Sequence, residues 1–257
     1  KSIYIYINSI LLFYYYKCKA IKMTEHIKIK RERNTQQTNK SLKISYCEDD
    51  DDDSIMEIGI DEAGRGPMLG RVYTGAVVLP KKIENFNHTL MKDSKKFHSE
   101  KKIREVAEYI KEHAVAWAVG YSDEKEIDDI NIRRATHKAM HQAIGEVITK
   151  LKEGKNSEIN NNDIMLLVDG NDFTLYYNNY KPLSHICIEG GDNAYTCIAA
   201  ASILAKVARD DYISELCTSH PELIEHYDLL KNKGYGTKNH MDGIKKYGIS
   251  PFHRKSF

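Results

Sequence analysis

The sequence lacks the features that mark several classes of protein. Its 257 residues include five cysteines, an odd number with no C-x-x-C spacing, so neither a zinc site nor a disulfide framework is indicated. Long hydrophobic runs are also missing: the apolar stretch 3–16 is too short to cross a bilayer, and no cleavage site of small residues follows it. We therefore expect a cytoplasmic protein with reduced thiols that contacts no membrane.

A strong net charge is missing too, since the chain carries only +1. The charge is distributed unevenly, with +8 over residues 1–46 and −6 over 48–53, which leaves −1 for 55–257. A nucleic-acid ligand would therefore have to be held by a local basic patch, because the domain as a whole provides no attractive field.

Residues 1–54 have the composition of a segment outside the folded domain. Positions 1–22 consist almost entirely of residue types that A/T-rich codons encode, which is consistent with translated upstream sequence and a true start at Met23. Positions 24–53 are polar and poor in residues that form a core, so we expect a disordered tail there. The folded, functional domain is expected to span 55–257.

The apolar patterns in that domain alternate between strand and helix. Strands are predicted at 55–60, 71–80, 114–122, 164–170 and 184–192. Helices are predicted at 99–113, 127–151, 193–212, 221–230 and 238–247. This order predicts an α/β fold with a mixed sheet flanked by helices and a helical C-terminal extension.

Four acidic residues lie at the ends of predicted strands. Asp61 and Glu62 come after the first, Asp169 ends a continuous apolar run, and Asp192 follows two glycines. Ligands of open α/β sheets bind beyond the strand ends, and Glu62, placed past its strand, is free to face the same way as Asp61. Carboxylates without Cys or His suit Mg²⁺ or Mn²⁺. The alternative is structural, with the acids as turn formers and Asp192 as the cap of helix 193–212.

The turn after the first strand contains Gly64, Arg65 and Gly66. Two glycines allow a positive φ angle and close approach of the backbone to a ligand. Backbone N–H groups and a guanidinium would then be available to a sugar-phosphate strand. An ordinary tight turn with an exposed arginine is the alternative.

Two basic patches also suit phosphate groups. Helical spacing places Ser202, Lys206 and Arg209 on one helix face. A second patch consists of Lys92, Lys95, Lys96, Lys101 and Lys102. Either patch alone is also typical of a solvated surface.

Several stretches together resemble a known family. "GIDEAGRGPMLG", "DSKKF", "VDGN", "EGGDNAYTCIAAASILAKVARD" and "NKGYGTKNH…YGISPFHRKSF" resemble, in order and spacing, the motifs of ribonuclease HII, the type 2 ribonuclease H family, over 55–257. The resemblance implies a ribonuclease-H-like mixed five-stranded sheet. It also implies an endonuclease that cuts the RNA strand of RNA/DNA hybrids and nicks DNA 5′ of single embedded ribonucleotides, leaving 5′-phosphate and 3′-hydroxyl ends.

The resemblance also implies roles for particular residues. The family's catalytic acids, which hold two Mg²⁺ or Mn²⁺ ions, match Asp61, Glu62, Asp169 and Asp192. The turn that senses the ribose 2′-hydroxyl matches Gly64, Arg65 and Gly66. Tyr235 matches a tyrosine that stacks at the RNA–DNA junction. The family's phosphate contacts match Lys95, Ser202 and Lys206.

Other functions remain open at this stage. Another metal-dependent nuclease on the same kind of sheet, such as a Holliday-junction resolvase or an integrase, would not need the glycine-rich turn or Tyr235. A protein that only binds hybrids, or a subunit that needs auxiliary proteins, would be a different class. We expect a monomeric enzyme whose partners are RNA/DNA hybrids and DNA that contains ribonucleotides, with auxiliary subunits left open.

Overall fold

The computed structural model describes residues 41–47, 55–154 and 159–257. The expectation of a tail over the preceding residues and over 48–54 lies outside this part of the chain. One compact unit begins at Ser41 and continues to Phe257. Within the described ranges, no helix combines the length and apolar character that crossing a membrane requires.

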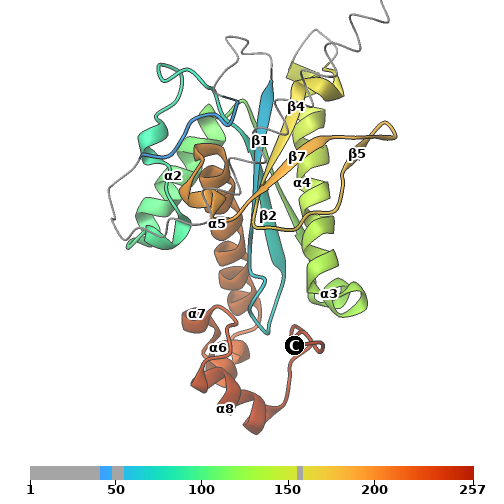
Figure 1. The fold of residues 1–257 in the computed structure, drawn as a ribbon. Coiled ribbons are helices and arrows are strands. Elements are labelled where there is room, and N and C mark those ends of the chain that lie inside the picture. The colour runs from blue at the N-terminus through green and yellow to red at the C-terminus, as the bar shows by residue number, and fades with distance from the viewer. Residues whose placement is uncertain (1–40, 48–54, 155–158) are drawn as a thin grey trace, which may run out of the picture. The chain divides into compact units, whose positions relative to one another are not determined.

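The centre of the fold is a five-stranded mixed sheet with the strand order β3-β2-β1-β4-β7 (Figure 1). The strands are β1 (Met56–Ala63), β2 (Val72–Val78), β3 (Ala116–Ser122), β4 (Ile164–Asp169) and β7 (Ser184–Ile188). β1 pairs antiparallel with β2 and parallel with β4, and β4 pairs parallel with β7. The predicted mixed five-stranded sheet is confirmed. A short hairpin, β5 (Tyr177–Asn178) and β6 (Lys181–Pro182), lies outside it.

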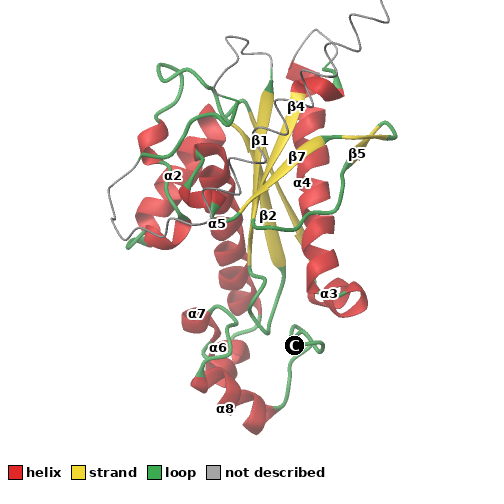
Figure 2. Ribbon diagram, in the orientation of Figure 1, coloured by secondary structure: helices red, strands yellow, loops and turns green. Residues whose placement is uncertain are grey.

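Helices cover both faces of the sheet, and a helical extension follows (Figure 2). They are α2 (Glu100–His113), α3 (Glu124–Ile130), α4 (Ile132–Gly154), α5 (Thr196–Ser219), α6 (Glu222–Tyr227), α7 (Leu229–Asn232) and α8 (Lys238–Tyr247). One buried cluster joins α4 to Ile58, Ile60 and Leu166, and another joins α2 and α5 to Leu167. Neighbouring residues of β4 therefore face opposite layers, as strand alternation requires.

Three predicted helices differ from the observed ones. The helix expected over 221–230 is divided at Asp228, whose positive φ of 54° separates α6 from α7. The single helix expected over 127–151 is broken at Asn131, whose positive φ of 69° interrupts the helical path and whose side chain accepts from the N–H of Arg134 in α4. The helix expected over 193–212 begins later and continues to Ser219. Its first turns are buried because α5 lies directly on the sheet.

Two glycines allow α5 to lie this close. A Cβ atom added at Gly59 would overlap the backbone carbonyl of Cys197, and one added at Gly75 would overlap that of Ala201. Small residues on both surfaces therefore set the distance from β1 and β2 to α5. This close packing brings Ser202 of α5 next to the end of β1 that carries Asp61.

Residues 41–47, here called the N-terminal strap, pack on the same unit. The Lys43 N–H donates to Ala194 O at 2.8 Å, and Lys43 O accepts from Thr196 N at 2.9 Å. The sequence predicts a domain boundary after residue 54, and the strap, which precedes that boundary, lies against the start of α5. The strap is held by Glu57 of β1, which lies 12 residues further along the chain than the strap's Ser45. The buried Glu57 carboxylate accepts from the Ser45 hydroxyl at 2.7 Å and from the backbone N–H groups of Tyr46 and Cys47.

Glu57→Gln should lower the free energy of unfolding by about 1–2 kcal/mol, because charged acceptor bonds to the strap become weaker neutral ones. Urea denaturation of the purified chain measures this. Glu84→Gln, at an exposed position, is the matched control and should shift stability by less than about 0.5 kcal/mol. Equal effects of the two substitutions would show that the strap adds nothing to stability.

Candidate active site

Asp61 lies on β1 and is buried, 5% exposed, to the same extent as Asp192. Oδ1 of Asp61 accepts from the Glu62 N–H at 2.7 Å, and the nearby Ser202 hydroxyl favours the ionised form of Asp61. Burial raises the pKa of Asp61 well above its usual value, and the negative charges of Glu62 and Asp169 raise it further. The site therefore concentrates negative charge that a cation would neutralise.

Glu62 lies within β1, opposite Thr74 of β2. The prediction that Glu62 sits past the strand is wrong, because the β1–β2 ladder continues to Ala63. Its carboxylate lies 3.4 Å from Nη1 of Arg65. Burial raises the pKa of Glu62, Arg65 opposes that rise, and Asp169 adds to it. Glu62 therefore belongs to the same electrostatic cluster although it is an ordinary strand residue.

Asp169 and Asp192 are linked through a short 3₁₀ helix, η4 (Gly191–Asn193). Oδ1 of Asp169, the last residue of β4, accepts from the Gly191 N–H at 2.6 Å. Burial raises the pKa of Asp192, and the charges of Asp93 and Asp169 raise it further. The alternative that Asp192 caps the next helix is wrong, since Tyr195 occupies the N-cap position of α5.

Lys95 is a cation that faces these acids from another segment than Arg65 does. It lies in the 3₁₀ helix η2 (Ser94–Lys96), whose N-cap is Asp93. Burial alone would lower the pKa of Lys95, but the surrounding carboxylates raise it overall. These carboxylates belong to Asp93, Asp192, Asp61 and Asp169. Ser94 also contacts Ser202, with 3.0 Å between the hydroxyl oxygens, so the "DSKK" segment borders the acidic cluster.

Asp93 and Asn193 are site residues that the sequence analysis did not single out. Nδ2 of Asn193 donates to Asp93 at 3.2 Å and to Asp192 at 3.0 Å. The amide thus holds two acidic side chains near each other. Their positions in "DSKK" and "GGDN" are the sequence signal that identifies them.

The acidic cluster fits hard divalent ions by its chemistry. Among the described residues, no three His, Cys, Asp or Glu side chains are arranged to hold one ion by themselves. Mg²⁺ is usually bound through one or two carboxylates together with phosphate oxygens, so a complete protein cage is not required. Burial and the repulsion of Glu62 and Asp169 raise the pKa of Asp61, and a bound cation would relieve that repulsion.

The glycine-rich turn is held from inside by an arginine. Gly64 has φ +95° and no space for a Cβ, because the Arg209 side chain lies against it. The buried Arg254 guanidinium donates at 2.6–3.0 Å to four backbone carbonyls. These carbonyls belong to Gly64, Arg65, Pro67 and Gly70. Arg254 was not predicted as a site residue, and "HRKSF" is the only sequence signal for it.

Tyr235 lies beside this turn. Its ring is half exposed, and Cε1 lies 3.5 Å from the position of a Cβ added at Gly66. The Arg209 guanidinium carbon lies 5.9 Å from the ring centroid. The preceding Gly234, at φ +85°, accepts from the Met68 N–H at 2.8 Å. The structure thus brings Tyr235 and the turn together from segments about 170 residues apart.

The predicted basic face of α5 is only partly a surface. Ser202 is buried at the acidic cluster, whereas Lys206 is partly exposed and its Nζ lies 2.6 Å from Asp210. Arg209 is buried and donates to Lys233 O at 2.6 Å. The expectation that Arg209 presents its charge on that face is wrong, because its guanidinium supports the glycine-rich turn and Tyr235.

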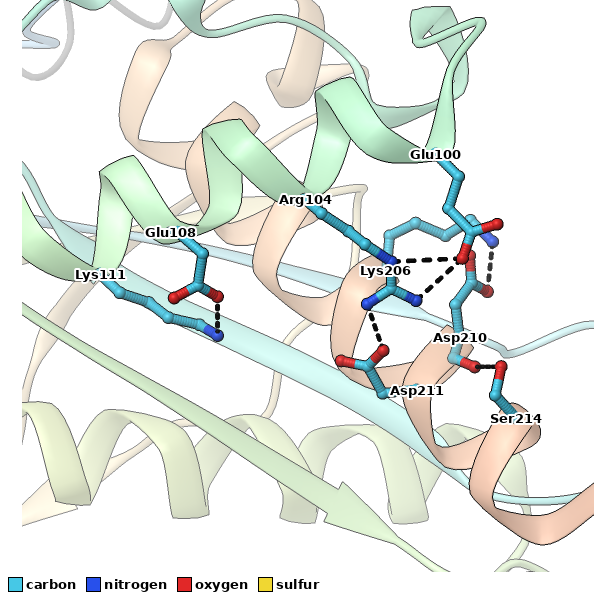
Figure 3. Close-up of polar contacts among 8 residues, drawn as sticks. All are labelled: Glu100, Arg104, Glu108, Lys111, Lys206, Asp210, Asp211 and Ser214. Carbon is cyan, nitrogen blue, oxygen red and sulfur yellow. Dashed lines mark hydrogen bonds and ion pairs between the residues drawn. The ribbon is translucent and has the colours of Figure 1, made fainter. Parts of the chain in front are cut away.

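Figure 3 shows the polar contacts between α2 and α5 around Lys206. Arg104 of α2 donates to Glu100 of its own helix and to Asp211 of α5. Lys206 and Asp210 lie directly beside this bridge (Figure 3). Lys206 is therefore held in an ion-pair network next to the site.

Comparison with known proteins identifies the family. The Ribonuclease HII family model matches residues 58–257. Ribonuclease HII of Bacteroides thetaiotaomicron is 42% identical over 203 residues, covering 79% of this chain and 90% of the relative. The enzyme of Parabacteroides distasonis is 43% identical over 202 residues, covering 79% and 89%.

Solved structures share the fold at lower identity. The RNase HII in a PCNA complex from Archaeoglobus fulgidus has a TM-score of 0.58 at 23% identity, covering 79% of this chain and 95% of that one. Bst-RNase HIII in complex with Mn²⁺ has a TM-score of 0.54 at 15% identity, covering 75% and 70%. The family model and the relatives at about 42% identity establish that the chain belongs to the ribonuclease HII family, and thus to the endonucleases that act on RNA/DNA hybrids.

Proposed function

We propose that this enzyme hydrolyses the RNA strand of RNA/DNA hybrids and also nicks DNA on the 5′ side of single embedded ribonucleotides, leaving 5′-phosphate and 3′-hydroxyl ends. The observation that carries the proposal is the acidic cluster around Asp61, next to a glycine-rich turn and Tyr235. The cluster supplies the charge for phosphodiester chemistry. The turn and the tyrosine supply a surface that can select the sugar.

The proposed cofactors are two Mg²⁺ or Mn²⁺ ions held by Asp61, Glu62, Asp169 and Asp192. Such ions, when bound, activate water for in-line attack and stabilise the leaving 3′-oxygen. The chain itself orients the carboxylates, since the Gly191 N–H holds Asp169 and the Glu62 N–H holds Asp61. The Mn²⁺ named for Bst-RNase HIII supports a divalent ion in this fold.

Selection of the ribonucleotide is assigned to the turn at Gly64, Arg65 and Gly66. A contact to the 2′-hydroxyl is needed, because this group marks a ribonucleotide within a DNA strand. On the buried side of the turn, Arg254 donates hydrogen bonds to the backbone carbonyls of Gly64 and Arg65. On the other side, Arg65 and Gly66 are exposed to solvent. The exposed backbone can approach a sugar closely, and the Tyr235 ring can stack on the neighbouring nucleotide.

Phosphate contacts are assigned to Lys95, Ser202 and Lys206. Lys95 already lies among the acids, where its charge also limits their repulsion. Lys206 would exchange its contact with Asp210 for a phosphate oxygen. We further propose that residues 55–257 form the catalytic domain and that it acts as a monomer in the cytoplasm.

A single substrate panel tests this function. The purified chain alone should nick a DNA duplex containing one ribonucleotide and should degrade a long hybrid, with Mg²⁺ or Mn²⁺ but not with EDTA. An all-DNA duplex should stay intact, and denaturing gels against size markers locate the cut and its ends. Cutting of all-DNA would favour a resolvase-like nuclease instead. Inactivity on both RNA-containing substrates would mean that auxiliary subunits are required or that the proposal is wrong.

A further inference from the structure

Two buried histidines in the C-terminal region have no part in the mechanism above. His240 of α8 and His253 are 0% and 3% exposed. Their Nε2 atoms lie 3.0 Å apart, and both rings pack against Tyr227. Such a pair must share a single proton between the two nitrogens, because two N–H groups cannot face each other across a hydrogen bond.

The groups at the two ends of this pair fix where the proton lies. Nδ1 of His253 lies 2.9 Å from the backbone nitrogen of Ser250, whose N–H can only donate, and 2.8 Å from the Ser250 hydroxyl, which can donate as well. This Nδ1 therefore accepts, and the ring proton is on Nε2. Nδ1 of His240 lies 2.9 Å from Tyr235 O, which can only accept, so this Nδ1 carries the proton. His253 Nε2–H therefore donates to His240 Nε2.

Both rings must be neutral for this arrangement. Burial lowers the pKa of His253 to about 4, and His240 contributes to that shift. Burial also lowers the pKa of His240. The geometry and the burial thus agree on one continuous chain of hydrogen bonds from Ser250 to Tyr235.

The chain of hydrogen bonds ends at the backbone carbonyl of Tyr235, the residue that lies against the glycine-rich turn. Tyr235 O accepts from the Thr237 N–H at 2.8 Å as well as from His240, and Tyr235 N donates to Asn232 O at 3.0 Å. The backbone of Tyr235 is therefore fixed from the protein interior while its ring is half exposed. His253 precedes Arg254, which holds the turn, so adjacent residues support both elements.

We propose that His240 and His253 are positioning residues whose hydrogen-bond chain, with its single proton direction, fixes Tyr235 beside the Gly64–Gly66 turn for recognition of the ribonucleotide–DNA junction. The functional part rests on the proposed role of Tyr235. Neither histidine touches the substrate, and the pair acts only through the Tyr235 backbone.

The proton positions are tested directly on the full chain labelled with ¹⁵N-histidine. Long-range ¹H–¹⁵N spectra at neutral pH should show His253 protonated on Nε2 and His240 protonated on Nδ1, assigned from the signals that change in His253→Asn. The Nε2–H form of His240, or a charged ring in either residue, would overturn the proposal.

Cleavage assays test the positioning role. The readout is kcat/KM at a single ribonucleotide divided by kcat/KM on a long hybrid. Tyr235→Ala should lower this ratio by about tenfold, the range of one lost base stack. His253→Asn keeps an acceptor for Ser250 but removes the donor to His240, and should lower the ratio by about five- to tenfold. His253→Gln restores a donor at the Nε2 position and should recover most of that loss.

A double variant and thermal unfolding distinguish a role that acts through Tyr235 from a general loss of stability. Tyr235→Ala combined with His253→Asn should be no worse than Tyr235→Ala alone, because the histidine acts through the tyrosine. Additive losses, or equal losses in His253→Asn and His253→Gln at matched melting temperatures, would refute the positioning chain. If Tyr235→Ala leaves the ratio unchanged, the role of Tyr235 fails and the positioning role fails with it. In that case the NMR spectra still test separately whether His253 is protonated on Nε2 and His240 on Nδ1.

Discussion

Asp61→Asn should reduce hybrid cleavage by about 10³-fold or more while leaving hybrid binding within a few-fold of wild type. The substitution keeps the size and the hydrogen-bonding oxygen but removes a buried charge at the centre of the acidic cluster. The contacts assigned to phosphate come from other residues and remain in place. Single-turnover cleavage and fluorescence anisotropy with a labelled hybrid measure the two effects separately.

The same substitution has a second expected signature. Because burial and neighbouring acids raise the pKa of Asp61, its ionised form destabilises the metal-free protein at neutral pH, so Asp61→Asn should unfold at a higher temperature in EDTA. Added Mn²⁺ should stabilise wild type and have a smaller effect on the variant. Asp129→Asn, at an exposed position, is the control and should match wild type in cleavage, in hybrid binding and in thermal unfolding. Near-normal turnover of Asp61→Asn would remove Asp61 from the proposed metal site.

Arg254→Met should lower the free energy of unfolding by about 3–5 kcal/mol, since it removes a buried cation and leaves its four carbonyl partners without their donor. The methionine keeps much of the apolar volume, so the loss reports mainly on the hydrogen bonds. Guanidinium denaturation measures the change. Arg134→Met, at an exposed position of α4, is the matched control and should change stability by less than about 0.5 kcal/mol.

The cleavage activity of Arg254→Met tests whether Arg254 also matters for function. The variant should lose cleavage even at temperatures where circular dichroism shows that it is folded, because the turn no longer has a fixed conformation. The loss should be larger for a single embedded ribonucleotide than for a long hybrid. A stable variant with unchanged activity on both substrates would mean that the turn needs no support from Arg254.

The sequence predicted the parts of this molecule that depend on local patterns. Continuous apolar runs identified the central strands, and the acids that follow them lead to Asp61, Asp169 and Asp192, which the structure places in one electrostatic cluster. A serine directly before the apolar spacing of the helix predicted at 99–113 is typical of an N-cap, and the structure confirms Ser99 as the N-cap of α2. These features depend on neighbours a few residues away, so periodicity and capping rules are sufficient to find them.

The features that sequence reasoning missed depend on distant partners. Glu57 has the sequence context of a strand residue, and only the folded chain shows that it binds the N-terminal strap. Arg209 has helical spacing typical of a basic face, yet packing against Gly64 buries it. Asn131 breaks a helix within an otherwise periodic stretch because its backbone adopts a positive φ. No local pattern contains this information.

The contact between Arg254 and Gly64 spans 190 positions of the chain. A ribosome makes the turn early and its supporting arginine late, so the nascent chain carries Asp61 and Glu62 long before the adjoining turn has a stable shape. Contacts of such long sequence separation also form slowly, because a large loop must close first. We therefore expect the proposed recognition of the sugar to be among the last properties that the molecule acquires on folding, after the strands of the sheet that carries the acids are in register.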